Sequence, residues 1–292
     1  MGNKIGFMQG RLSPIVNNMI QSFPWNNWRE EISVAASLGL SKMEWTLDQD
    51  RLYENPIMTT AGRREILDLL QKHKIDIPSL TGDCFMQEPF WKATGSAEME
   101  LQRDFMAVAQ AASAVGARIV VVPLVDNGAI ETVEQEDRLV TFLQSKVNEL
   151  RALGMMIAFE SDFAAGNLGR FINRLDSSVF GINYDIGNSA GLGFNPVEEF
   201  AAYAHRITNV HVKDRVLNGT TVPLGQGNAD FPLVFALMNQ YEYHGNLILQ
   251  TARAADDNHS RALKTYRDAV ENWLEAATHA SLSNPEPEPD TR

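Results

Sequence analysis

Short apolar runs alternate with longer segments of helical periodicity along most of this chain. Eight of the apolar runs have the length and composition of buried strands. They span residues 5–9, 42–45, 77–80, 118–122, 156–160, 180–185, 207–212 and 247–250. Strands that are separated by helices pair in parallel, because each connecting helix returns the chain to the same end of the sheet. The alternation therefore predicts an α/β protein with a parallel sheet.

The segments between these strands carry the start and stop signals of helices. Residues 132–153 open with the capping-box pattern Thr-Val-Glu-Gln, gather apolar side chains on one face and stop at Gly154. Residues 98–115 show the same apolar face before Gly116. The other predicted helices span residues 26–38, 60–72, 165–175, 196–204, 231–240 and 261–277. Each helix is expected to cover a pair of strands from outside.

Eight strands and eight helices predict a single (β/α)8 TIM barrel over residues 1–280, because closure removes both edges of the sheet. An open, doubly wound sheet is the alternative. A dinucleotide-binding sheet of that kind needs a Gly-x-Gly-x-x-Gly turn after the first strand, and residues 6–11 read Gly-Phe-Met-Gln-Gly-Arg. Residues 281–292 are rich in Pro and Glu and are predicted to form a disordered, solvated tail.

Composition narrows the classes of partner. The net charge of -12 opposes nucleic acid and anionic membranes as partners, because binding to phosphates needs a basic surface. The single cysteine, Cys84, permits no disulfide within the chain and no multi-cysteine metal site. The N-terminus lacks the apolar stretch of a signal peptide, and no segment approaches the roughly 20 apolar residues that span a bilayer. A cytoplasmic protein that binds a small molecule is expected.

Three predicted strands end on residues that bind metals or handle protons: Glu160, Asp185 and His211. In a barrel the carboxyl ends of all strands meet at one face, where active sites lie. Two carboxylates and an imidazole suit Mn²⁺, Mg²⁺, Co²⁺ or Zn²⁺. The alternative is a buried hydrogen-bonded network or a salt bridge to Lys213 or Arg215. The metal site is favoured, because buried carboxylates without a compensating cation are costly.

Other polar and aromatic residues follow the first three strands: Gln9, Arg11, Glu44, Trp45 and Asp83. Arg11 is expected either to clamp a carboxylate or phosphate of the substrate or to form a loop salt bridge. Glu44 and Asp83 are candidates for a catalytic acid or base, with a structural ion pair as the alternative. Gln9 and Trp45 are candidates for substrate contacts.

Two loops are further candidates for ligand contacts. The turn at residues 225–227, Gly-Gln-Gly, either presents amide groups to an anion, which Lys213 and Arg215 would neutralise, or is a plain tight turn. The aromatic side chains of loop 85–91 are expected to form a wall of a sugar-binding pocket.

The polar strand ends stand in recognisable motifs. Phe-Glu ends at Glu160, Asp-Ile-Gly-Asn begins at Asp185, and Val-His-Val-Lys-Asp surrounds His211. Residues 223–231 follow, with the sequence Pro-Leu-Gly-Gln-Gly-Asn-Ala-Asp-Phe. In this combination the chain resembles the sugar isomerase and epimerase proteins with a xylose-isomerase-like barrel, which are related to endonuclease IV. The resemblance covers nearly the whole barrel.

The resemblance implies four metal ligands: Glu160, Asp185, His211 and, on the eighth strand, Gln250. Sugar epimerases usually carry Glu at this last position and use the carboxylates of strands five and eight as two bases. Glutamine keeps an oxygen for a metal but accepts no proton at neutral pH. Asn188 stands where many relatives carry a histidine that orients the substrate. Lys213 and Arg215 are expected to contact the substrate as well.

The leading functional hypothesis is a metal-dependent isomerase or epimerase that acts on a sugar through an enediolate. Glu160 would be the base, with proton return from the same residue, Asp83, Glu44 or water. Dehydration or hydrolysis of a sugar on the same barrel is the alternative, and a barrel that binds sugars without catalysis is the third possibility. Members of the family often form dimers or tetramers, so a homo-oligomer is possible.

Overall fold

A closed barrel of eight parallel strands lies at the centre of the computed structural model, which describes residues 4–16 and 19–283. The strands follow one another in the order β1-β10-β7-β6-β5-β4-β3-β2. They are β1 (Ile5–Met8), β2 (Met43–Leu47), β3 (Ser79–Gly82), β4 (Ile119–Leu124), β5 (Met156–Ser161), β6 (Phe180–Asp185), β7 (Ile207–Val212) and β10 (Asn246–Leu249). The predicted barrel is confirmed, and every strand end lies within two residues of its predicted position.

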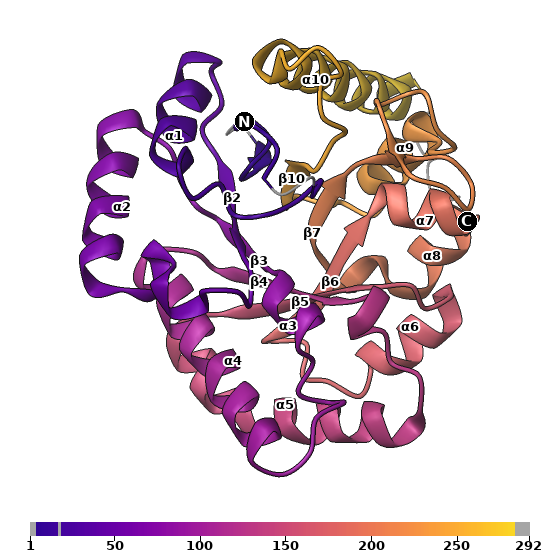
Figure 1. Ribbon diagram of the computed structural model, residues 1–292. Helices are drawn as coiled ribbons and strands as arrows, with labels where there is room; N and C mark the ends of the chain where they lie inside the picture. The colour runs from indigo at the N-terminus through magenta and orange to yellow at the C-terminus, as the bar shows by residue number, and fades with distance from the viewer. Residues whose placement is uncertain (1–3, 17–18, 284–292) are drawn as a thin grey trace, which may run out of the picture.

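The helices form a ring around this barrel (Figure 1). They are α1 (Trp28–Ser37), α2 (Thr60–His73), α4 (Ser96–Ala114), α5 (Val133–Leu153), α6 (Ala165–Ile172), α8 (Pro196–Tyr203), α9 (Phe231–Gln240) and α10 (His259–Ser283). All eight were predicted from the sequence. Helix α10 continues three residues into the segment 281–292 that was predicted as a tail, and the rest of that segment lies outside the described residues.

Local capping explains where these helices begin and end. The Thr132 side chain accepts a hydrogen bond from the Gln135 amide at 3.3 Å at the start of α5, and Gly154 ends the helix with φ of 62°. The Thr59 side chain caps α2 in the same way by accepting from the Gly62 amide at 3.0 Å. Two short helices, α3 (Asp83–Gln87) and α7 (Ile186–Leu192), were not predicted, because they have only five and seven residues and show no helical periodicity in the sequence.

A small antiparallel hairpin of β8 (Asp214–Arg215) and β9 (Thr221–Val222) extends the loop after β7. It too was not predicted, because two-residue strands leave no periodicity in a sequence. Four single-turn 3₁₀ helices complete the described elements: η1 (Leu52–Glu54), η2 (Pro56–Met58), η3 (Asp126–Gly128) and η4 (Ala204–Arg206).

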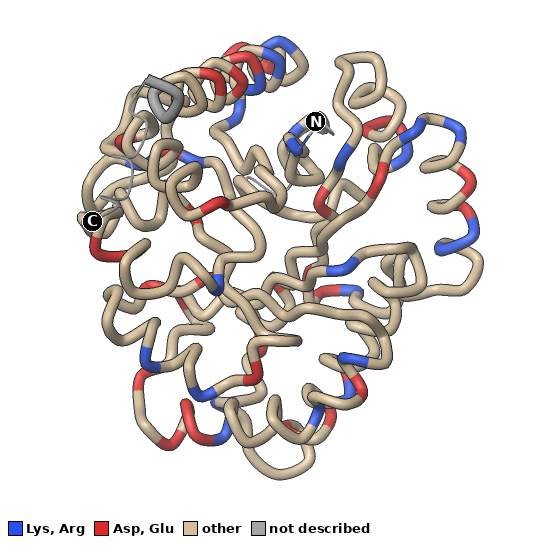
Figure 2. The backbone as a smooth tube through the Cα atoms, turned by 180° about the vertical axis from the view of Figure 1, so that it is seen from behind, with Lys and Arg blue, Asp and Glu red and all other residues tan. Residues whose placement is uncertain are grey.

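Charged residues of both signs alternate along the outer helices (Figure 2). Two salt bridges join Glu136 of α5 to Arg170 in α6 and to Arg174 just after that helix. No helix in the described part of the chain is long and apolar enough to cross a membrane.

Asp214 holds the loop that follows the hairpin. Its carboxylate is fully buried and accepts hydrogen bonds from the amides of Gly225, Gly227 and Ala229 at 2.8, 2.9 and 3.1 Å. A Cβ atom at position 227 would lie 2.2 Å from Asp214 Oδ1, so this tight approach requires glycine. The Gly-Gln-Gly segment was predicted to be either an anion-binding site or a plain tight turn. The structure supports the tight turn, because both glycine amides already donate to the Asp214 carboxylate.

Replacing Asp214 with Ala should destabilise the protein by roughly 2–3 kcal/mol, because three amide donors lose their shared acceptor. The urea midpoint should fall while the slope of unfolding stays constant. Asp230→Ala is a matched control in the same loop, since it removes only the N-cap of α9, at a cost of about 1 kcal/mol. An equal loss in the two variants would show that Asp214 does not hold the loop.

Candidate metal centre and substrate cavity

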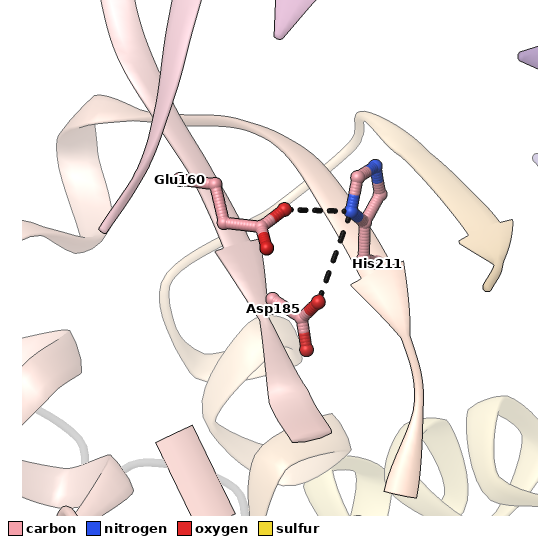
Figure 3. Close-up of side chains that lie close together, drawn as sticks. All are labelled: Glu160, Asp185 and His211. Carbon is pink, nitrogen blue, oxygen red and sulfur yellow. Dashed lines mark hydrogen bonds and ion pairs between the residues drawn. The ribbon is translucent and has the colours of Figure 1, made fainter. Parts of the chain in front are cut away.

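Three neighbouring strands bring Glu160, Asp185 and His211 together at the carboxyl end of the barrel (Figure 3). Asp185 and His211 are register partners between β6 and β7. Glu160 Oε2 lies 3.0 Å and Asp185 Oδ2 lies 3.9 Å from His211 Nδ1. One ligand atom of each residue lies within 4.8 Å of the others, and all three side chains are buried. The predicted convergence of these three strand ends is therefore present in the fold.

Glu44 fixes the other side of the histidine ring from inside the barrel. Its Oε1 lies 2.7 Å from His211 Nε2, and this carboxylate also accepts from Ser79, Thr81 and Asn209 at 2.5, 2.5 and 2.9 Å. Glu44 is fully buried, with both oxygens occupied. An ionised carboxylate only accepts, so Nε2 carries a hydrogen and Nδ1 is the nitrogen that faces Glu160 and Asp185.

Two buried asparagines connect Glu44 to Glu160. Asn209 donates its amide hydrogens to Glu44 Oε2 and to Asn183 Oδ1, each at 2.9 Å. The amide nitrogen of Asn183 must then point the other way, where it donates to Glu160 Oε2 at 2.9 Å and lies 3.0 Å from His211 Nδ1. The orientation of each amide follows from the acceptor before it.

The charges of this cluster require a cation near Nδ1. Burial disfavours the charged form of His211, but the charges and hydrogen bonds of Glu44 and Glu160 outweigh it and raise the pKa of His211 to about 10. Burial also raises the pKa of Glu160, yet the hydrogen bond and charge of His211 leave it below its usual value. Burial raises the pKa of Asp185 above its usual value. Either an imidazolium proton or a metal ion satisfies the oxygens that face Nδ1.

Lys213 reaches into the same cluster from just beyond β7. Its ammonium group lies 3.1 Å from Asp185 Oδ2, 2.9 Å from Asn188 Oδ1 and 3.3 Å from Gln250 Oε1. Arg215 also donates to Asn188 Oδ1, at 3.0 Å. Because Lys and Arg only donate, the Asn188 amide nitrogen is turned toward Glu160 Oε1, at 2.6 Å.

A second chain of hydrogen bonds orients Gln250, which follows β10. Arg11 donates to Gln21 Oε1 at 3.3 Å, while Gln21 Nε2 donates to the Asp83 carboxylate at 2.7 Å. With the Gln21 amide fixed in this way, Gln250 donates Nε2 to Gln21 Oε1 at 2.8 Å. Its oxygen therefore points to Lys213 and into the site.

The donor set fits a divalent cation. Two carboxylates and one imidazole nitrogen converge, and the Gln250 oxygen and Asp185 Oδ2 both lie within hydrogen-bonding distance of the Lys213 ammonium group. Oxygen and imidazole donors suit Mg²⁺, Mn²⁺, Co²⁺ and Zn²⁺, and Glu44 supplies the carboxylate that commonly supports a metal-bound histidine.

A cavity of about 820 Å³ opens above this cluster. Six of the residues predicted from the sequence line it: Asp83, Glu160, Asn188, Lys213, Arg215 and Gln250. Burial raises the pKa of Asp83 to about 7, and the nearby charges of Asp48 and Glu160 add to this. Asp83 is therefore protonated below about pH 7 and ionises as the pH rises through that value.

Several predicted contacts lie elsewhere. Trp45 is fully buried, packs against Phe23 and Trp28 and donates to Asn55, so it belongs to the core and does not line the cavity. Gln9 is fully buried and accepts from the Thr46 amide.

Arg11 does not line the cavity either: it lies beneath the loop after β1, where it donates to the Ile20 carbonyl at 2.7 Å. The aromatic wall expected at residues 85–91 is wrong, because Phe85, Phe90 and Trp91 are buried in the core.

Asn183, Asn209 and Gln21 were missed by the sequence analysis. The two asparagines stand two residues before Asp185 and His211, and this spacing places their side chains on the same side of each strand. That signal was present in the sequence. Gln21 lies in a long loop and carries no such signal.

Asp185→Asn should weaken the binding of Mn²⁺ by more than about 100-fold, since loss of a direct ligand exceeds the cost of losing a supporting residue. Asparagine can still cap α7, where Asp185 Oδ1 accepts from the Asn188 amide, so the fold should persist. Calorimetric titration measures the affinity. Glu199→Gln, at a buried carboxylate outside the cluster, is the control, and equal affinities in the two variants would remove Asp185 from the ligand set.

Comparisons with known proteins agree with this architecture. The sequence profile described as xylose isomerase-like TIM barrel matches residues 32–277. An inosose dehydratase of Lacticaseibacillus casei (strain BL23) is 22% identical over 307 residues, which cover 84% of this chain and 100% of that protein. A solved L-ribulose 3-epimerase has a TM-score of 0.76 at 15% identity and covers 98% of this chain and 99% of its own.

The solved IOLI protein with a bound zinc atom has a TM-score of 0.73 at 16% identity, with 93% of this chain and 98% of that chain covered. Such structural likeness shows the shared fold, and the profile match extends over most of the chain. The chain belongs to the xylose isomerase-like TIM barrel family.

Proposed function

We propose that this protein is a metal-assisted lyase that removes water from a polyhydroxylated carbonyl compound, such as a keto-sugar or an inosose. The observation that carries this proposal is the pairing of one ionised base, Glu160, with one protonated acid, Asp83, in the same cavity. The inosose dehydratases among the curated relatives support the same reaction.

Glu160 removes the proton from the carbon next to the carbonyl group. His211 keeps the pKa of Glu160 low, and Asn183 and Asn188 hold its two oxygens in place. Asp83 then donates its proton to the hydroxyl group on the adjacent carbon, which departs as water, and both residues return to their starting states by exchange with solvent. The substrate loses one hydrogen and one hydroxyl group, so the atoms balance.

Four residues would hold the metal: Glu160, Asp185, His211 and Gln250. When bound, the metal supplies polarisation of the carbonyl group and stabilisation of the developing negative charge. Glu44 acts through His211, because it is buried beneath the ring and does not line the cavity.

The substrate would also meet three polar groups of the cavity wall. Lys213, Asn188 and Arg215 line the cavity beside Glu160, and the hydrogen bonds among them would hold the wall against which the substrate lies.

Gln250 favours elimination over two-base epimerisation. Epimerisation of the two-base kind removes a proton from one face of the carbon and returns another to the opposite face. The Gln250 amide cannot exchange a proton in this way. Elimination needs a second group only as an acid for the leaving hydroxyl, and Asp83 is protonated near neutral pH.

Aldose–ketose isomerisation is the second candidate, because Glu160 alone can carry a proton between two adjacent carbons. The two reactions are separated by the mass of the product, which is lighter by one water only after elimination. Inosose and a panel of ketoses with Mn²⁺ provide the screen. A protein that binds these compounds without converting any of them would contradict both reactions.

Glu160→Gln should lower kcat by about 10²–10⁴-fold, the usual contribution of a general base. Deuterium from D₂O should no longer enter the substrate at the carbon next to the carbonyl group, and NMR measures this exchange. Glu199→Gln is again the control. Exchange at the wild-type rate in the Glu160 variant would assign the base to another residue.

The pH profile should report Asp83. Because burial raises the pKa of Asp83 to about 7, the protonated acid is present below that pH and is lost as pH rises through it. The kcat/KM of the wild type should therefore fall above about pH 7. In Asp83→Asn, activity should be low and this alkaline limb should vanish. A limb that persists unchanged in the variant would rule out Asp83 as the acid.

A further inference from the structure

We infer that the cavity selects an uncharged substrate and rejects its phosphate ester. This inference rests on the proposed function, since it concerns the substrate of the same cavity. The inference rests on the hydrogen-bond donors that could hold a phosphate group. These donors, in the loop after β7 and on the two cations that line the cavity, are already bound to groups of the protein.

The first set of donors belongs to the loop after β7, where barrels frequently bind phosphate through backbone amides. Here the amides of Gly225 and Gly227 donate to the carboxylate of Asp214 at 2.8 and 2.9 Å. The carboxylate is buried within the protein, so an internal anion takes the place that a phosphate would need. No Cβ fits at position 227 beside this carboxylate, which keeps the turn closed around it.

The second set of donors belongs to the two cations that line the cavity. Lys213 has three N–H groups, and its ammonium contacts three acceptors, on Asp185, Asn188 and Gln250. Arg215 donates Nη1 to Asn188 and uses Nε and Nη2 on the Gly219 carbonyl. Bidentate capture of a phosphate along the Nε–Nη2 edge of Arg215 would break its contacts with the Gly219 carbonyl.

The opposite part of the wall repels anions. Asp126 and Asp162, which follow β4 and β5, line the cavity, and neither forms a salt bridge with a residue that the structure describes. Glu160 lines the cavity with them, so three carboxyl groups besides the protonated Asp83 face two cationic side chains. A phosphate dianion placed there meets negative charge, and the two cationic side chains are already hydrogen-bonded to groups of the protein.

Matched pairs of ligands test this inference directly. D-Fructose and D-fructose 6-phosphate form one pair, D-ribulose and D-ribulose 5-phosphate a second, and inorganic phosphate serves as a third probe. Calorimetry measures binding with and without saturating Mn²⁺, and kcat/KM is measured where turnover occurs. The ester of each pair should bind at least roughly tenfold more weakly than its parent, and inorganic phosphate should show no saturable binding.

The double variant Asp126→Asn/Asp162→Asn should raise the affinity of the ester relative to its parent by roughly threefold to tenfold, because it removes the repelling wall. Asp68→Asn/Glu134→Gln is the matched control, since it removes the same net charge from exposed positions that do not line the cavity. This control should leave the ratio unchanged.

The outcomes separate the inference from the proposed function. Tighter or equal binding of an ester, or saturable binding of inorganic phosphate in the wild type, overturns the inference whatever reaction is catalysed. Preferred binding of the uncharged member without any loss of water contradicts the lyase and leaves the inference standing. If no sugar binds, the proposed function fails, and inorganic phosphate alone decides whether the cavity excludes phosphate.

Discussion

The geometry of the site depends on one buried contact, that between Glu44 and the Nε2 nitrogen of His211. This contact crosses the inside of the barrel from β2 to β7 and fixes which ring nitrogen faces the other carboxylates. The amides of Asn209 and Asn183 take their orientation from the same carboxylate. A charge this deeply buried is tolerated only because its oxygens accept four hydrogen bonds.

The barrel and the convergence of Glu160, Asp185 and His211 could be predicted because both leave periodic signals. Strands that end on Glu160, Asp185 and His211 become neighbours as soon as parallel closure is granted, and the register between β6 and β7 pairs two of them. The path of a loop leaves no such signal. Glu44 and Trp45 are neighbours on β2, and both were predicted to lie in the site. Because side chains alternate along a strand, Glu44 points into the barrel while Trp45 points outward into the aromatic core.

Position 250 shows how a neutral side chain acquires a defined role from its surroundings. In isolation, a glutamine amide offers an oxygen or a nitrogen with little preference. Here Arg11 and Asp83 fix Gln21 from two sides, and Gln21 in turn leaves Gln250 only one favourable orientation. Arg11 was expected to touch the substrate, but its contacts place it two side chains away, where it aligns the oxygen of Gln250. These hydrogen bonds could not be predicted from the sequence, because Gln21 and Gln250 are far apart along it.

The two oxygens of Asp185 have different partners. One faces His211, and the other caps the first turn of α7. That helix carries Asn188 and Leu192 to the cavity, and Ser189 on it is bound to Glu199 of α8. Asp185 therefore links the candidate metal ligands to the cavity wall and, through Ser189 and Glu199, to the outer ring of helices. The position of Asn188 in the cavity wall thus depends on a side chain that is also a candidate metal ligand.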